Sequence, residues 1–254
     1  MKVTAGSVIV GYLDNGNWSA CFGLSYRDLT LYDAMRSHRI VRPNGRELRS
    51  LCSSGNIPDS RNDVAKAFLQ TDGEYLFFID TDMGFPKDAV DRLVKSAEDH
   101  GRKVVGGLCF ATARGTATGH YQDNYMVHPT MYRKVPNGYR PIREYRIDIT
   151  QDVDGTGAAC LLIHRSVLED VREKYGEAWF DRLPVEDGSS YYSEDLSFCV
   201  RLAELGIPVA VNTAVRTAHH KGIIYLDEDL WLANNGLTRE GLKQGGIPRP
   251  VLDP

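Results

Sequence analysis

The stretch EYLFFIDTDMGFP, Glu74 to Pro86, joins a run of five apolar residues directly to two aspartates. The apolar run predicts a fully buried strand of the kind that parallel sheets contain. Asp80 and Asp82 follow at its carboxyl end, which is where open α/β sheets bind their ligands. Two carboxylates this close repel each other, so we expect a cation between them or contact with water.

Strand and helix patterns alternate on both sides of this stretch. The predicted helices carry apolar residues at helical spacing and end signals such as Pro86 and Gly101. The order β-α-β-α-β-α-β predicts a mostly parallel sheet with helices on both faces. The predicted strands span 7–12, 37–42, 74–79 and 103–110, with a turn predicted at 43–45, and the helices between the strands span 18–35, 57–70 and 85–101.

The second half of the chain is less regular. Residues 111–154 predict loops and short antiparallel strands, such as 130–135 and 139–147. Apolar runs predict further strands at 157–163 and 207–222, and capped periodic segments predict helices at 165–176 and 193–206. Residues 223–254 carry weak signals. With no repeat or linker, the sequence predicts one domain over 1–254, made of halves 1–110 and 111–222 and a C-terminal extension, 223–254.

The composition is that of an ordinary globular protein. The 254 residues are 42% hydrophobic and 25% charged, with a net charge of -4, which argues against broad nucleic-acid binding. The five cysteines are odd in number and widely spaced, so we expect reduced thiols and a cytoplasmic location. No long apolar segment or signal peptide is evident, so we expect no membrane partner.

Asp80-Thr81-Asp82 admits several interpretations. Hard carboxylate oxygens suit Mg²⁺ or Mn²⁺ shared with substrate phosphates. An acidic turn that caps the following helix is an alternative. An EF-hand loop fails because Phe85 stands where glycine is required. A haloacid-dehalogenase-like phosphatase would use Asp80 as nucleophile, although it would carry the motif on its first strand. A nucleotidyltransferase would need a glycine-rich phosphate loop that the chain does not supply.

Three further motifs contain chemically capable side chains. Glu194 and Asp195 open a predicted helix, where acids are common caps and where a carboxylate could also deprotonate an acceptor hydroxyl. His219 and His220 end the last predicted strand; adjacent residues on a strand face opposite sides, so at most one would complete a metal site. Arg61, near a helix start, would favour a phosphate or an acidic neighbour.

Together these motifs resemble the GT-A glycosyltransferases, and within them a family 2-like group that bacteriophages encode. The resemblance rests on an ordered series from Val8 to Gly222: VIVGY, SRN, LFFIDTDMGFP, VVGGLCF, GTGAACLLIHRSVL, WF, SEDLSFCVRLAELGIPV and HHKG. It implies a three-layer α/β/α sandwich and a metal-dependent transfer of a sugar from a nucleotide sugar to an acceptor hydroxyl. A phosphatase and a non-catalytic sugar-nucleotide-binding protein are the alternatives.

The resemblance also implies roles for individual residues. Asp195 would be the catalytic base, with Glu194 beside it, and Asp82 would bind Mn²⁺ or Mg²⁺ together with His220, the first choice, or His219. The residues implied for the nucleotide sugar are Gly11, Tyr12, Arg61, Asp80 and Asp82. Those implied for the sugar or acceptor side are Gly107, Gly155, Thr156, Gly157 and Trp179.

The resemblance leaves the substrates open. The donor would be a UDP- or GDP-sugar, and the acceptor a virion protein, a modified DNA base or a glycan, in the host cytoplasm if a phage encodes the chain. Residues 111–154 interleave cations such as Arg133, Lys134 and Arg140 with tyrosines such as Tyr132 and Tyr139. This pattern is compatible with a nucleic-acid contact and also with an exposed amphipathic strand pair.

Overall fold

The computed structural model describes residues 3–51, 56–114, 125–221 and 224–244. Cys52, Gly222 and the Pro-rich end of the predicted extension lie outside these ranges. The centre of the fold is a seven-stranded sheet in which five strands run one way and β12 and β10 run the other. Its strands, in spatial order, are β10 (Thr150–Val153), β13 (Val209–Arg216), β5 (Val104–Leu108), β12 (Cys160–His164), β3 (Gly73–Ile79), β1 (Thr4–Asp14) and β2 (Leu48–Leu51).

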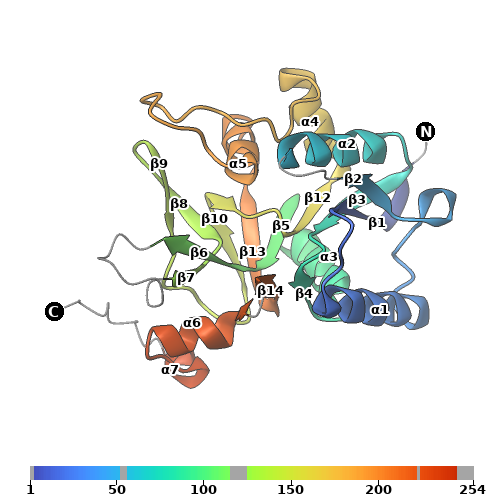
Figure 1. The fold of residues 1–254 in the computed structure, drawn as a ribbon. Helices are drawn as coiled ribbons and strands as arrows, with labels where there is room; N and C mark the ends of the chain where they lie inside the picture. Colours follow the sequence, from blue (N-terminus) through green and yellow to red (C-terminus); the bar gives the residue numbers. More distant parts are fainter. Residues whose placement is uncertain (1–2, 52–55, 115–124, 222–223, 245–254) are drawn as a thin grey trace.

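Helices cover both faces of this sheet, as Figure 1 shows. Side chains alternate along β3: Leu76 and Phe78 pack in one apolar cluster, whereas Phe77 and Ile79 pack in the other. The first cluster includes residues of α2 (Ile57–Leu69), α4 (Arg165–Tyr175) and α5 (Glu194–Glu204), and the second includes residues of α1 (Ala20–Met35) and α3 (Ala89–His100). The predicted three-layer α/β/α sandwich with a mostly parallel sheet is confirmed.

The helix ends follow the signals in the sequence. Gly101 ends α3 in the left-handed conformation, at φ 60°, which glycine adopts without strain. Ser193 caps α5 by accepting a hydrogen bond from the Leu196 backbone N–H. The second predicted strand, 37–42, is wrong in place, because Ile40 makes only an isolated bridge to Val8 and β2 begins at Leu48, whereas the turn predicted at 43–45 is confirmed. Pro43, which has no N–H to donate, opens a short 3-10 turn there.

Small sheets complete the domain beside the main one. The predicted hairpin exists as β8 and β9, although β9 ends at Pro141 rather than continuing to 147. A separate three-stranded sheet joins β4, directly after Asp82, to β14 and β15. The elements of these sheets are β4 (Met83–Gly84), β6 (Phe110–Arg114), β7 (Tyr125–Pro129), β8 (Met131–Val135), β9 (Gly138–Pro141), β11 (Gly155–Thr156), β14 (Ala218–Lys221) and β15 (Ile224–Leu226).

The C-terminal segment adds α6 (Glu228–Asn234) and α7 (Arg239–Lys243), which carry part of the core. Trp231 is 1% exposed and lies against the rings of Phe110 and Tyr145. Glu228, also buried, accepts from the Tyr145 hydroxyl and pairs with two arginines of the segment and of β13. None of the helices within the described ranges combines the length and apolar character that a membrane span requires.

Candidate active site

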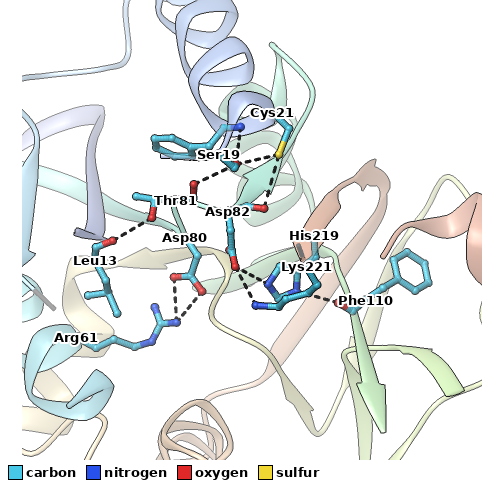
Figure 2. Close-up of polar contacts among 11 residues, drawn as sticks. Leu13, Ser19, Cys21, Arg61, Asp80, Thr81, Asp82, Phe110, His219 and Lys221 are labelled. Atoms are coloured by element: carbon cyan, nitrogen blue, oxygen red, sulfur yellow. Dashed lines mark hydrogen bonds and ion pairs between the residues drawn. The ribbon is translucent and has the colours of Figure 1, made fainter. Parts of the chain in front are cut away.

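The two aspartates of the motif lie in the turn between β3 and β4 and point to different partners (Figure 2). The Asp80 N–H donates to the Ala159 carbonyl at 3.0 Å, and the Met83 N–H donates to the Asp80 carbonyl at 3.1 Å. Thr81 between them is buried, and its hydroxyl donates to the Leu13 carbonyl at the end of β1. These bonds fix the turn. The two carboxylates have separate cationic partners, which relieve the repulsion expected between them.

Asp80 is paired with a buried arginine. Arg61, on the first turns of α2, donates from Nη2 to both Asp80 oxygens, at 3.1 and 3.2 Å, and its side chain is 4% exposed. Burial raises the pKa of Asp80, as does the neighbouring Asp82 charge, whereas the Arg61 guanidinium opposes this rise. Arg61 was predicted to hold the nucleotide; in the structure its charge is directed at protein carboxylates.

The same guanidinium reaches the acids of α5. Arg61 Nε lies 3.7 Å from Glu194 Oε1, and Arg182 lies 4.0 Å from the other oxygen of Glu194. Arg61 Nε is buried and has no hydrogen-bond partner within the described part of the chain. The Glu194 side chain is 12% exposed and is therefore held by cations. Asp195, the next residue, is the acid that is available to act as a base.

Asp195 sits at the N-terminus of α5, half-buried. Its Oδ1 accepts from the Leu196 N–H at 2.8 Å and from the Ser193 hydroxyl. Its Oδ2 faces the strand segment at Gly157, where an added Cβ would lie 3.4 Å away. Within the described part of the chain no hydrogen bond engages Oδ2, which is left for a further partner.

Asp82 binds two basic side chains through one oxygen. His219 Nε2 lies 3.0 Å and Lys221 Nζ 2.9 Å from Asp82 Oδ2, and the His220 backbone N–H donates to the Asp82 carbonyl at 2.8 Å. Burial favours the protonated carboxyl, but the hydrogen bonds and charges of His219 and Lys221 outweigh it and lower the pKa of Asp82 to about 2.

The two histidines face opposite sides of β14. His219 is on the side of Asp82, whereas the His220 ring packs at 5.0 Å on Tyr225. His220 was the first choice for the metal from the sequence, but the geometry favours His219. The reason is the antiparallel register of β14 with β4, in which His219 pairs with Met83 and its side chain reaches the preceding aspartate.

The Asp82–His219 pair fits a divalent metal ion. His219 Nδ1 lies 3.2 Å from the Phe110 carbonyl, which accepts only from a protonated nitrogen. In the structure Nε2 donates to Asp82 Oδ2 at 3.0 Å; if Nε2 gives up its proton, its lone pair and the carboxylate face each other, and a divalent cation between them would satisfy both. Among the described residues, no group of three or more His, Cys, Asp and Glu side chains is arranged to hold a metal. Two protein ligands suffice where substrate phosphates and water complete the shell.

The glycines after β10 lie under the N-terminus of α5. A Cβ on Gly155 would lie 2.9 Å from Leu196, so the absence of a side chain allows this close approach. Thr156 is 1% exposed, and its Oγ1 has no hydrogen-bond partner among the described residues. Gly157 thus lies beside Asp195, and Gly155 lies against the neighbouring Leu196; that Gly155, Thr156 and Gly157 line the acceptor side stays a prediction.

Other predicted site residues have packing roles. Gly11 lies mid-strand, where a Cβ would be 2.6 Å from Val64, and Tyr12 packs with Trp18 in an aromatic cluster. A Cβ on Gly107 would be 2.9 Å from Cys160 Sγ.

Trp179 was predicted to line the sugar or acceptor side. In the structure it is instead fully buried, and its Nε1 donates to the Leu168 carbonyl. Lys221 was missed, although its position two residues after His219 puts both side chains on one strand face.

Two basic residues of β8 are engaged within the protein. Lys134 pairs with Glu186 at 2.5 Å and lies over the rings of Tyr139 and Tyr192. Arg133 pairs with Asp154. These contacts favour an amphipathic strand pair over a nucleic-acid surface.

Comparison with known proteins places this site in context. Residues 62–172 match the sequence model of glycosyl transferase family 2. The solved structure titled "Crystal Structure of A197 from STIV" is similar, with 16% identity, a TM-score of 0.54, and coverage of 88% of this chain and 91% of that one. The S. aureus TarS 1-349 structure is 16% identical with a TM-score of 0.41, over 85% of this chain and 59% of that one. No curated protein matches the chain by sequence.

The fold is therefore of the GT-A type, and the family match supports a glycosyltransferase. The matched segment contains the Asp80-Thr81-Asp82 turn. It ends before α5 and before β14, so the contacts of Asp195 and His219 are independent observations.

Proposed function

We propose that the protein is a metal-dependent glycosyltransferase that moves a sugar from a nucleoside-diphosphate sugar to an acceptor hydroxyl. The observation that carries this proposal is the Asp82–His219 pair, oriented by the Phe110 carbonyl at the carboxyl end of β3. A carboxylate and an imidazole facing each other at 3.0 Å form the beginning of a divalent-metal site at the edge where this fold binds ligands.

Asp82 and His219 would hold Mn²⁺ or Mg²⁺. When bound, such an ion would act as a Lewis acid that stabilises the departing nucleoside diphosphate. The Asp80 side chain is 27% exposed and would accept a hydrogen bond from a hydroxyl of the donor, while Arg61 keeps the Asp80 carboxylate oriented. The role of Arg61 is thus to position Asp80 rather than to contact the nucleotide.

Asp195 is the proposed base. Its Oδ1 is engaged by Ser193 and Leu196, so Oδ2 would take the proton from the acceptor hydroxyl. Glu194, held by Arg61, would orient the start of α5 and would not exchange a proton. Gly157 lets the backbone approach Asp195 closely and Gly155 lets it approach Leu196, and the two glycines would thereby shape the acceptor side.

The proposed substrates follow from these groups. A divalent ion recognises a diphosphate, so the donor would be a UDP- or GDP-sugar, and the acceptor would be a hydroxyl on a virion protein, a modified DNA base or a glycan. The proposed location is the cytoplasm, that of a host if a phage encodes the chain. A phosphatase with Asp80 as nucleophile is disfavoured because both Asp80 oxygens accept from Arg61.

The test uses the full chain with a panel of UDP- and GDP-sugars and Mn²⁺, first by thermal shift and then by release of free nucleoside diphosphate. We expect one donor to stabilise the protein and to be turned over, and we expect EDTA and Asp82→Asn each to abolish turnover. Asp99→Asn, which removes an exposed carboxylate paired with Lys95 along α3, is the matched control. Turnover that survives both EDTA and Asp82→Asn contradicts the proposal.

A further inference from the structure

Lys221 shares its contact with His219, because both reach Asp82 Oδ2 from the same face of β14. Residues two apart on a strand point to the same side, so this pairing is built into the strand. The oxygen that would coordinate a divalent ion is therefore already occupied by an ammonium group, at 2.9 Å.

The two basic side chains differ in their freedom to move. His219 is 15% exposed, and its second ring nitrogen is held by the Phe110 carbonyl. Lys221 is 53% exposed, and its charge is carried on a flexible four-carbon stem with three donors. Of the two, Lys221 is the group that is able to leave Asp82 without disturbing the fold.

A divalent ion and the Lys221 ammonium would compete for Asp82 Oδ2. Oxygen ligands lie about 2.1 Å from Mg²⁺, so an ion on this oxygen would lie close to the ammonium and repel it. The other carboxylate of the motif, Asp80, is engaged by Arg61 and offers Lys221 no alternative partner. A diphosphate that binds the same ion would bring new negative charge to Lys221.

We propose that Lys221 is an exchangeable cation: it neutralises Asp82 before metal binds, and it passes to the donor diphosphate when a divalent ion takes its place. The second half of this inference rests on the proposed function, since that function supplies the diphosphate. Lys221 would thereby set a threshold for metal binding and link occupancy of the ion to capture of the donor.

The first experiment measures Mn²⁺ binding to the full chain by calorimetry, without nucleotide. Lys221→Met removes the ammonium and keeps the apolar stem, and we expect about tenfold tighter Mn²⁺ binding, within the usual range of coupling between sites. Lys95→Met removes one exposed positive charge on α3 and is expected to bind Mn²⁺ like the wild type. Asp82→Asn is expected to abolish binding in either background. Unchanged or weaker Mn²⁺ binding by Lys221→Met, or no binding by any variant, overturns the exchange.

The second experiment measures UDP and GDP binding at saturating Mn²⁺. We expect Lys221→Met to bind the preferred nucleotide about tenfold more weakly than the wild type and Lys95→Met to bind it equally well. Equal nucleotide affinity in Lys221→Met overturns the transfer of Lys221 to the diphosphate. If the wild type binds neither nucleotide, the proposed function fails, while the Mn²⁺ measurement still decides whether Lys221 competes with metal.

Discussion

Arg61 donates from a single nitrogen to both oxygens of Asp80, at 3.1 and 3.2 Å, from a side chain that is 4% exposed. The same guanidinium lies 3.7 Å from Glu194. One buried charge thus connects the turn that follows β3 with the start of α5. The donor and acceptor sides of the proposed site share a counter-ion, so a change on one side will be felt on the other.

Arg61→Met should destabilise the protein strongly, because it removes the buried charge that faces both the partly exposed Asp80 and the buried Glu194. We expect a loss of about 3–5 kcal/mol in the free energy of unfolding, measured by urea denaturation. Arg61→Lys keeps the charge and should lose less. Arg182→Met removes the exposed arginine near Glu194 and should change stability by less than about 1 kcal/mol. Equal effects at Arg61 and Arg182 would show that burial does not govern this network.

His219→Ala and His220→Ala form a matched pair on adjacent positions of β14. His219→Ala removes a proposed metal ligand, so we expect at least about tenfold weaker Mn²⁺ binding, measured by calorimetry. His220→Ala removes a ring that packs on Tyr225 and should leave Mn²⁺ affinity within about twofold of wild type. A larger loss of Mn²⁺ affinity in His220→Ala would restore the residue that the sequence favoured.

Asp82 should make stability depend on acid pH. Its pKa in the folded protein is lowered to about 2, so its contribution is present above the ordinary value near 3.8 and is lost as the pH falls toward 2. Because the side chain is 35% exposed, we expect a contribution of about 1 kcal/mol after solvent screening. Unfolding measured in EDTA between pH 5 and 2.5 should show this loss in the wild type and not in Asp82→Asn. Parallel curves for both proteins would contradict the assignment.

Asp195→Asn should separate chemistry from binding. The amide keeps the shape of the side chain but does not accept the acceptor proton, so we expect kcat for transfer to fall at least about 100-fold. Donor affinity, measured by calorimetry with Mn²⁺, should stay within about twofold of wild type because Asp195 is not a proposed donor ligand. A fall in donor affinity with kcat retained would place Asp195 on the donor side instead.

Trp231→Ala should show that the C-terminal segment is part of the domain. The ring is 1% exposed against Phe110 and Tyr145, and its removal should cost about 3–5 kcal/mol of unfolding free energy. Trp18→Ala, at a ring that is 46% exposed, is the control and should cost clearly less. Similar losses at both positions would mean that Trp231 does not contribute to the core as its burial indicates.

The architecture was accessible from the sequence because its signals are local. Five apolar residues before Asp80 predict β3, and Pro86 with Gly101 delimits the helix that became α3. The turn at Pro43 was predicted correctly, but the strand was placed before it, where Ile40 makes an isolated bridge, whereas β2 follows the turn at Leu48.

The site was less accessible because its contacts are distant in sequence. The alternation of side chains along β14 predicts that one of the two histidines faces inward. Which histidine does so depends on the register of β14 with β4, and residues far away in the chain set that register. Arg61 was expected to favour a phosphate or an acidic neighbour, and its partners in the fold are the acids Asp80 and Glu194, which the sequence alone did not identify. Trp179 was misjudged because an aromatic residue near a site and one in the core look alike in sequence.

The contact between Asp82 and His219 joins positions 137 apart, through the pairing of β4 with β14. Closing so long a segment of chain costs entropy that only the completed core offsets. A nascent or truncated chain that lacks β14 retains Asp82 but not its basic partners. The proposed metal site would therefore form only once the chain has been synthesised and folded through Lys221. An unfinished chain would bind neither the ion nor the nucleotide.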